Sequence, residues 1–170
     1  MKRISNLPIV ISNASPIINL AIIGRLGLLK KFWGKIFVPE AVWEEVVIDG
    51  EDKDEVVEIK KADWIVVEKV KDQNLALLLM QNLDKGESEA IVLAIEKNAD
   101  IILLDETDAR EAADIYKIEK TGVLGILLLA KLKNEIPSLK QEIEKLKIKA
   151  HFRLKDSLIQ SVLKDAGEIP

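Results

Sequence analysis

The chain has no cysteine, a single histidine and few aromatic residues, and each scarcity excludes a class of chemistry. Without cysteine there is no disulfide, no thiolate nucleophile and no Cys-based zinc site. Because His151 is alone, a metal site built on a pair of histidines is excluded as well. Aromatic residues make up 4% of the 170 residues, so the core must consist mostly of Ile, Leu, Val and Ala. Any chemistry must therefore use carboxylates, amides and hydroxyls.

Long apolar runs and an excess of positive charge are also missing. The longest apolar stretch, residues 122–130, is far shorter than the roughly 20 residues that a membrane span needs. Pro8 and Pro16 interrupt the region where a signal peptide would lie, so we expect a cytoplasmic protein without a membrane partner. The net charge of -4 argues against a broadly basic, non-specific nucleic-acid binder. The length predicts one domain over residues 1–170.

Short apolar runs alternate with helical patterns along the chain. Strands are predicted at residues 8–12, 35–38, 64–67 and 101–104, with weaker candidates at 116–118 and 149–154. Helices are predicted at residues 16–23, 26–32, 39–48, 54–61, 74–82, 86–97, 108–115, 123–133, 138–147 and 155–164. Such alternation predicts an α/β fold, a three-layer α/β/α sandwich with a mainly parallel sheet. The strands are apolar throughout, as expected for burial on both faces.

Two of the predicted strands end in polar residues. Residues 9–11 lead into Asn13, and residues 101–104 lead into Asp105. Ligands of open α/β sheets bind outside the carboxyl ends of the strands, so these residues predict one shared site. Asn13 alone could equally be a turn residue. Ser15, followed by Pro16, is predicted to be the N-cap of the next helix.

Further acids lie on the predicted helices. Glu45 lies near the apolar face of helix 39–48, where a glutamate is unusual, but Glu44 has similar surroundings and the pattern does not choose firmly between them. Either could be an ordinary residue at the boundary of the core. Glu87 fits a capping box with Asp84 and also begins a buried helix that would aim it at the edge of the sheet. Glu89 is about 200° further around that helix, so both glutamates cannot face one ion from the same side.

Asp105 and Asp108 complete the set of acids. Asp105 could simply cap the following helix with Asp108 at its third position, although the end of a buried strand is the favoured place for a ligand. Carboxylates without histidine or thiolate select hard cations such as Mg²⁺ or Mn²⁺. These ions activate water and stabilise the charge that develops on a phosphoryl group. Clustered acids repel one another, so an empty site should have raised carboxylate pKa values.

Four segments together resemble the PIN-domain family, in its branch of small prokaryotic PIN-like proteins. They are VISNASPIINLA, VPEAVWEEVV, LDKGESEAIVLAIEKNADIILLDETDAR and TGVLGILLLAKLKNEI, and the resemblance runs from Ile9 to about Leu163. The combination is specific, whereas any single segment is not. The resemblance implies an α/β/α sandwich that acts as a Mg²⁺- or Mn²⁺-dependent ribonuclease. It also implies a homodimer and, for members that are toxins of toxin–antitoxin pairs, a small antitoxin protein as partner.

The resemblance also implies roles for individual residues. By position, the metal ligands would be Asn13, Glu45, Glu87, Asp105 and Asp108, and the last four of these would form the catalytic set. Ser15 would order the first ligand by hydrogen bonding. Arg110 and Lys131 resemble signature residues of this branch.

Asn13 is the departure from the family pattern, because the first position of active PIN nucleases is normally aspartate. Its amide oxygen is neutral and is a weaker ligand for a hard cation than a carboxylate. The sequence therefore leaves two functions open: a metal-dependent ribonuclease, or a catalytically inactive PIN-like protein that binds RNA or a protein partner. A receiver-like α/β domain would need a lysine near the last strand, and the sequence offers no convincing one.

Overall fold

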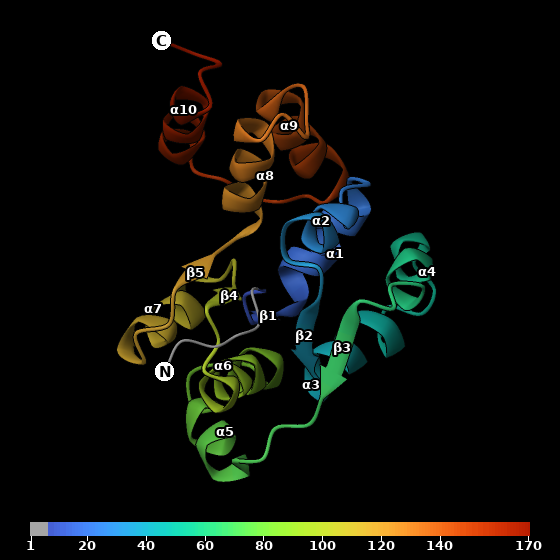
Figure 1. Cartoon of the computed structure of the whole chain (residues 1–170), viewed down its shortest axis with the longest axis vertical. Helices are drawn as coiled ribbons and strands as arrows, with labels where there is room; N and C mark the ends of the chain where they lie inside the picture. Colours follow the sequence, from blue (N-terminus) through green and yellow to red (C-terminus); the bar gives the residue numbers. More distant parts are fainter. Residues whose placement is uncertain (1–6) are drawn as a thin grey trace.

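The computed structural model describes residues 7–170 and shows a parallel sheet between two layers of helices (Figure 1). Its five strands run in the order β3-β2-β1-β4-β5, and every pairing between neighbours is parallel. The strands are β1 (Val10–Ser12), β2 (Ile36–Pro39), β3 (Ile65–Glu68), β4 (Ile101–Leu103) and β5 (Lys120–Thr121). The predicted α/β/α sandwich is confirmed.

The strand order reverses direction between β1 and β4. The chain builds β1, β2 and β3 outward in one direction and then returns to place β4 on the other side of β1. Ser12 pairs with Leu103, and the Asn13 amide donates to the Leu103 carbonyl at 3.0 Å, so the two strands end side by side. In open α/β sheets this reversal opens a crevice at the carboxyl edge, which is where ligands bind.

Helices connect all the strands. They are α1 (Ala14–Ile22), α2 (Gly27–Trp33), α3 (Glu40–Trp43), η1 (Glu44–Ile48), α4 (Asp54–Lys60), α5 (Gln73–Leu79), α6 (Lys85–Lys97), α7 (Thr107–Ile115), α8 (Val123–Leu132), α9 (Leu139–Lys149) and α10 (Asp156–Asp165). Here η1 is a short π-helix that continues α3. None of the helices found within residues 7–170 is long and apolar enough to cross a membrane.

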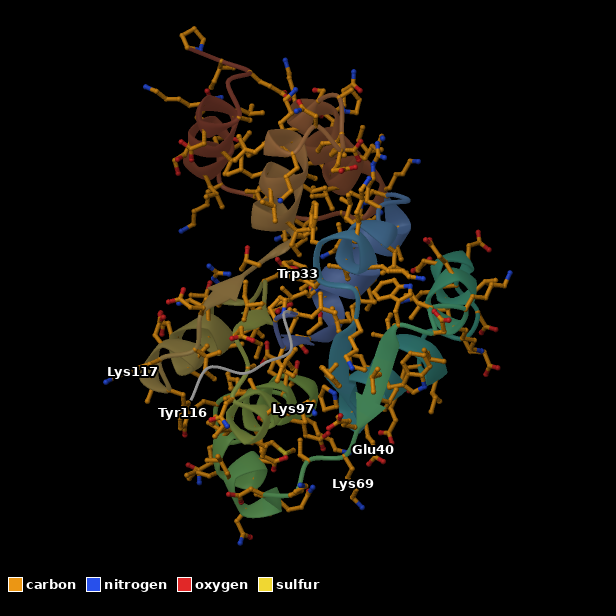
Figure 2. The ribbon with its side chains drawn as sticks, in the orientation of Figure 1. Trp33, Glu40, Lys69, Lys97, Tyr116 and Lys117 are labelled. Carbon is orange, nitrogen blue, oxygen red and sulfur yellow. The ribbon has the colours of Figure 1, made fainter. Side chains whose placement is uncertain are left out.

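Alternate strand residues feed two hydrophobic cores, one on each face of the sheet. Val10 and Leu103 pack with α1, α2, α8 and α9, while Ile11 and Ile102 pack with α5, α6 and α7. Figure 2 shows Lys97 between α6 and the β2–β3 side of the sheet, where its Nζ lies 2.8 Å from a Glu68 carboxylate oxygen. Burial on both faces explains why the sequences of β1, β2 and β4 are largely apolar, whereas β3 and β5 at the two edges carry polar and exposed residues.

The two weaker strand predictions are wrong. Lys117 has a positive φ of 56°, and residues 116–118 form the turn that ends α7; the edge strand β5 follows at residues 120–121. Residues 149–154 contain the end of α9 and an extended connection to α10 that does not pair with the sheet. His151 begins this connection with a φ of 51°, a conformation that strands do not use.

Two of the predicted helices also differ in the structure. Helix α1 begins at Ala14 with Asn13 at the N-cap, so Ser15 is not the cap and Pro16 lies within the first turn. Proline is tolerated there because the first-turn amides have no partner inside the helix. The predicted helix 39–48 is divided into α3 and η1. A π-turn inserts one extra residue, and it changes the direction of the side chains that follow.

Candidate metal centre

Asn13 lies at the end of β1 with 4% of its surface exposed. Its Nδ2 donates to Glu106 Oε2 at 3.4 Å, whereas its Oδ1 is buried and has no hydrogen-bond partner among the described residues. Although Asn13 occupies the N-cap of α1, its side chain does not cap the helix. A buried oxygen without a partner costs about 1–3 kcal/mol, so such groups call for a functional explanation. This oxygen is available to a ligand.

Gly86 leaves open the space into which Asn13 Oδ1 points. A Cβ atom added to Gly86 would lie 3.4 Å from Asn13 Oδ1, 3.0 Å from Glu45 Oε2 and 3.4 Å from Asp84 Oδ1. Three oxygens from three different segments therefore converge on one small volume. Any side chain at position 86 would fill it.

The structure separates the two neighbouring glutamates of η1. Glu44 pairs with Lys85 at 3.9 Å, while Glu45 reaches the space above Gly86. Burial raises the pKa of Glu45, and the nearby carboxylates of Asp84 and Glu106 raise it further. Glu45 is thus the glutamate of this pair that shares the electrostatic environment of the site.

Glu87 both caps α6 and faces the other acids. The predicted capping box is confirmed: the Glu87 amide donates to Asp84 Oδ1 at 2.7 Å, and the Asp84 amide donates to Glu87 Oε2 at 3.0 Å. Burial raises the pKa of Glu87, and the charges of Asp84, Glu106 and Asp108 act in the same direction. Glu89 lies elsewhere, because its Oε2 accepts from the amide of Ala41 at 3.1 Å.

Asp105 follows β4 and is held from two sides. Its Oδ1 accepts from the Val123 amide at 2.8 Å, and its Oδ2 accepts from Ser15 Oγ at 3.2 Å. Burial raises the pKa of Asp105 to about 6 despite these hydrogen bonds and the charge of Arg110. Asp105 therefore caps α8 rather than α7, whose N-cap is Glu106. Ser15 was expected to order Asn13 by hydrogen bonding, but its hydroxyl donates to Asp105 instead.

The remaining predicted residues lie at different distances from these acids. Asp108 is exposed in the first turn of α7 and contributes charge to Glu87. Arg110 Nη1 donates to the Leu104 carbonyl at 2.9 Å, which fixes α7 against the end of β4. Lys131 lies outside the site and binds the Pro137 carbonyl at 2.7 Å.

Glu106 is a site residue that the sequence reasoning missed. It accepts from Asn13 Nδ2, and its charge raises the pKa of Glu45, Glu87 and Asp105. The signal was present, since Glu106 directly follows Asp105. Neighbouring side chains in a strand point to opposite faces, which would argue against Asp105 and Glu106 facing the same site. Both residues follow the end of β4 at Leu103, so this rule does not apply to them.

The gathered oxygens fit a hard divalent cation. They comprise one amide oxygen and carboxylates, which Mg²⁺ and Mn²⁺ prefer over nitrogen or sulfur. Within residues 7–170 no three acidic or histidine side chains stand close enough to enclose an ion by themselves. Burial raises the pKa values of Glu45, Glu87 and Asp105, and repulsion between neighbouring carboxylates raises them further. A bound cation would offset both effects.

Comparison with known proteins adds the family. The family model described as PIN domain matches residues 9–168. Among solved structures, the chain is similar to a PilT N-terminus domain protein from the hyperthermophilic archaeon Sulfolobus solfataricus P2, with 19% identity and a TM-score of 0.50, over 76% of this chain and 95% of that one. A search of curated proteins found no match. The chain therefore belongs to the PIN-domain family, whose members are typically nucleases and usually bind divalent metal ions.

Proposed function

We propose that this protein is a metal-dependent endoribonuclease that uses Mg²⁺ or Mn²⁺. Glu45, Glu87 and Asp105 would hold the ion, with Asn13 and Asp108 assisting. The observation that carries the proposal is the unpartnered, buried Oδ1 of Asn13, which points into the same space as Glu45 Oε2. An oxygen that the chain leaves without a donor, next to a carboxylate with a raised pKa, is what a cation site requires.

The residues of the site would divide the chemistry among them. A bound divalent cation supplies Lewis-acid stabilisation of the charge that develops on the phosphoryl group. Glu106 accepts from the Asn13 side-chain NH₂, which leaves the Asn13 amide oxygen free to bind an ion. With His151 exposed on the α9–α10 connection, carboxylates must carry the proton transfers. Their raised pKa values make them better bases near neutral pH.

The test is cleavage of single-stranded RNA with and without Mn²⁺. The parent protein should cleave only with the metal, and Asp105→Asn should abolish cleavage. Asp63→Asn, at an exposed residue, is the matched control and should retain full activity. Full activity in Asp105→Asn would refute the assignment of this site.

A second function is favoured by one specific observation. Asn13 contributes no negative charge at the position where active PIN nucleases normally have aspartate, which would suit a PIN-like protein that binds RNA or a protein partner without cutting it. Titration of the apo protein with Mn²⁺ by calorimetry separates the two functions. Binding below millimolar metal supports the nuclease, and no binding at millimolar metal supports the inactive alternative.

The roles as toxin and as homodimer remain proposals inherited from the family resemblance. Expression in a bacterial host tests the first, because a toxin should arrest growth and Asp105→Asn should remove the arrest. Sedimentation of the purified chain tests the second. Neither result alters the assignment of the metal ligands.

A further inference from the structure

A hollow of about 490 Å³ adjoins Asp105 on the side of Gly122. Its walls come from the start of α7, strand β5, the start of α8, the α9–α10 connection and α10. Asp105 lines it, whereas Asn13, Glu45 and Glu87 do not. The hollow is therefore a separate space that shares one wall with the candidate metal centre.

The α9–α10 connection forms one side of this hollow. Phe152, Arg153, Leu154 and Lys155 all line it. Phe152 and Leu154 are half-buried and pack against the hydrophobic core, which anchors the connection, while Arg153 and Lys155 are exposed. Figure 1 shows this connection passing the lower end of α8, where that helix begins.

Four cationic side chains line the hollow, and two of them are already engaged. Arg110 donates to the Leu104 carbonyl, and Lys120 is paired with Asp114. The side chains of Arg153 and Lys155 make neither a hydrogen bond nor an ion pair with any residue between 7 and 170. Two free cations beside an acidic centre are suited to a ligand with negative charges along its length.

Three helices begin at the hollow, which adds to its positive character. Thr107 is the first residue of α7, Gly122 is the N-cap of α8 and Lys155 is the N-cap of α10. The N-caps of α7 and α10 give no side-chain acceptor to the helix amides. Free amides and the helix dipole favour anions at these ends, and the hydroxyls of Thr107 and Thr121 add donors.

We propose that this hollow, hereafter the basic groove, binds the phosphodiester backbone of the RNA strand that passes the acidic centre. Arg153 and Lys155 would contact phosphates next to the scissile phosphate, which a cation bound by Asp105 would hold. The inference rests on the proposed function for the identity of the strand. It goes further by assigning substrate binding to the α9–α10 connection, which contributes nothing to the metal centre.

The experiment measures RNA binding separately from cleavage. Fluorescence anisotropy of a short labelled single-stranded RNA is recorded in EDTA for the full chain and for Arg153→Gln/Lys155→Gln. The matched control is Lys60→Gln/Lys61→Gln, which removes the same charge from exposed positions at the end of α4, across the sheet from α7 (Figure 1). Each lost phosphate contact lowers the slope of log K against log salt by about 0.7, so the groove variant should lose about 1.4. At 0.1 M salt this corresponds to about 25-fold weaker binding.

The outcomes of this experiment are decisive for the groove. Weaker binding and a shallower salt slope in the groove variant, with the control unchanged, would support it. Equal losses in both variants, or no binding by the parent protein in EDTA, would overturn it. With Mn²⁺ present, the groove variant should raise KM more than it lowers kcat.

A different result would refute the proposed function. If the parent protein binds RNA through Arg153 and Lys155 but does not cleave it, the nuclease function is refuted and the basic groove is supported. If the parent protein cleaves RNA but the two double variants bind RNA equally well, the nuclease function is supported and the basic groove is refuted.

Discussion

The largely buried carboxylate of Asp105 should make the apo protein less stable at neutral pH than it is in mild acid. Its pKa rises from 3.8 to about 6 on folding, so between these values the folded state binds a proton that the unfolded state has released. Stability therefore falls as pH rises through this window, and the loss is complete above the folded pKa. A shift of about 2 units corresponds to about 3 kcal/mol.

Asp105→Asn removes this penalty while keeping the geometry. The amide oxygen of Asn can accept from the Val123 amide, and its NH₂ can donate to Ser15 Oγ, which already accepts from Asn19 Nδ2. We expect the free energy of unfolding in EDTA to rise by up to about 3 kcal/mol at pH 8, and by less than about 1 kcal/mol at pH 4. The same substitution should abolish RNA cleavage.

Urea unfolding of the parent and of Asp105→Asn, from pH 4 to pH 8, measures this difference. Because the other carboxylates are the same in both proteins, their contributions to the pH dependence of stability cancel in the difference. Asp63→Asn controls for the loss of one surface charge. A variant that is no more stable than the parent at pH 8, or a difference that does not change with pH, would refute the reasoning. Mn²⁺ should raise the melting temperature of the parent far more than that of the variant, and more at pH 8 than at pH 5.

Three further predictions follow from individual contacts. Glu106→Gln should weaken Mn²⁺ binding about tenfold or more because it removes a negative charge, and adding Asn13→Asp should restore the binding. Calorimetry of the single and double variants tests whether Glu106 supplies the negative charge that Asn13 lacks. Gly122→Ala should destabilise the fold by roughly 1–3 kcal/mol in urea unfolding, because its Cβ would lie 2.5 Å from Asp105 Oδ1, and an unchanged midpoint would contradict this. Glu89→Ala should cost about 1–3 kcal/mol through the lost acceptor for the first turn of α3 while leaving Mn²⁺ affinity unchanged, so a drop in affinity would place Glu89 in the site.

The sequence predicted the central part of the fold because that part depends on local signals. Apolar runs marked β1 and β4, and the polar residues that end them marked the edge at which Asn13 and Asp105 lie. The capping box also follows from sequence spacing alone. These features need only nearby residues and the alternation of strands and helices.

The features that were missed depend on tertiary packing. Strand β5 has only two residues, Lys120 and Thr121, and no apolar run to reveal it. The π-turn at η1, which begins with Glu44 and Glu45, has no distinct period in so short a segment. Glu106 was overlooked because its partner Asn13 is 93 positions away, and only the pairing of β1 with β4 brings them together.

The long separation between the two halves of the site has a consequence for synthesis on the ribosome. Asp105 gains its backbone partner only from Val123, and it reaches Ser15 only after β4 has been added beside β1. A nascent chain grows at about 5–20 residues per second, so for most of translation the N-terminal strand exists without the acids that complete the centre. The candidate metal centre therefore stays incomplete until most of the chain has emerged from the ribosome.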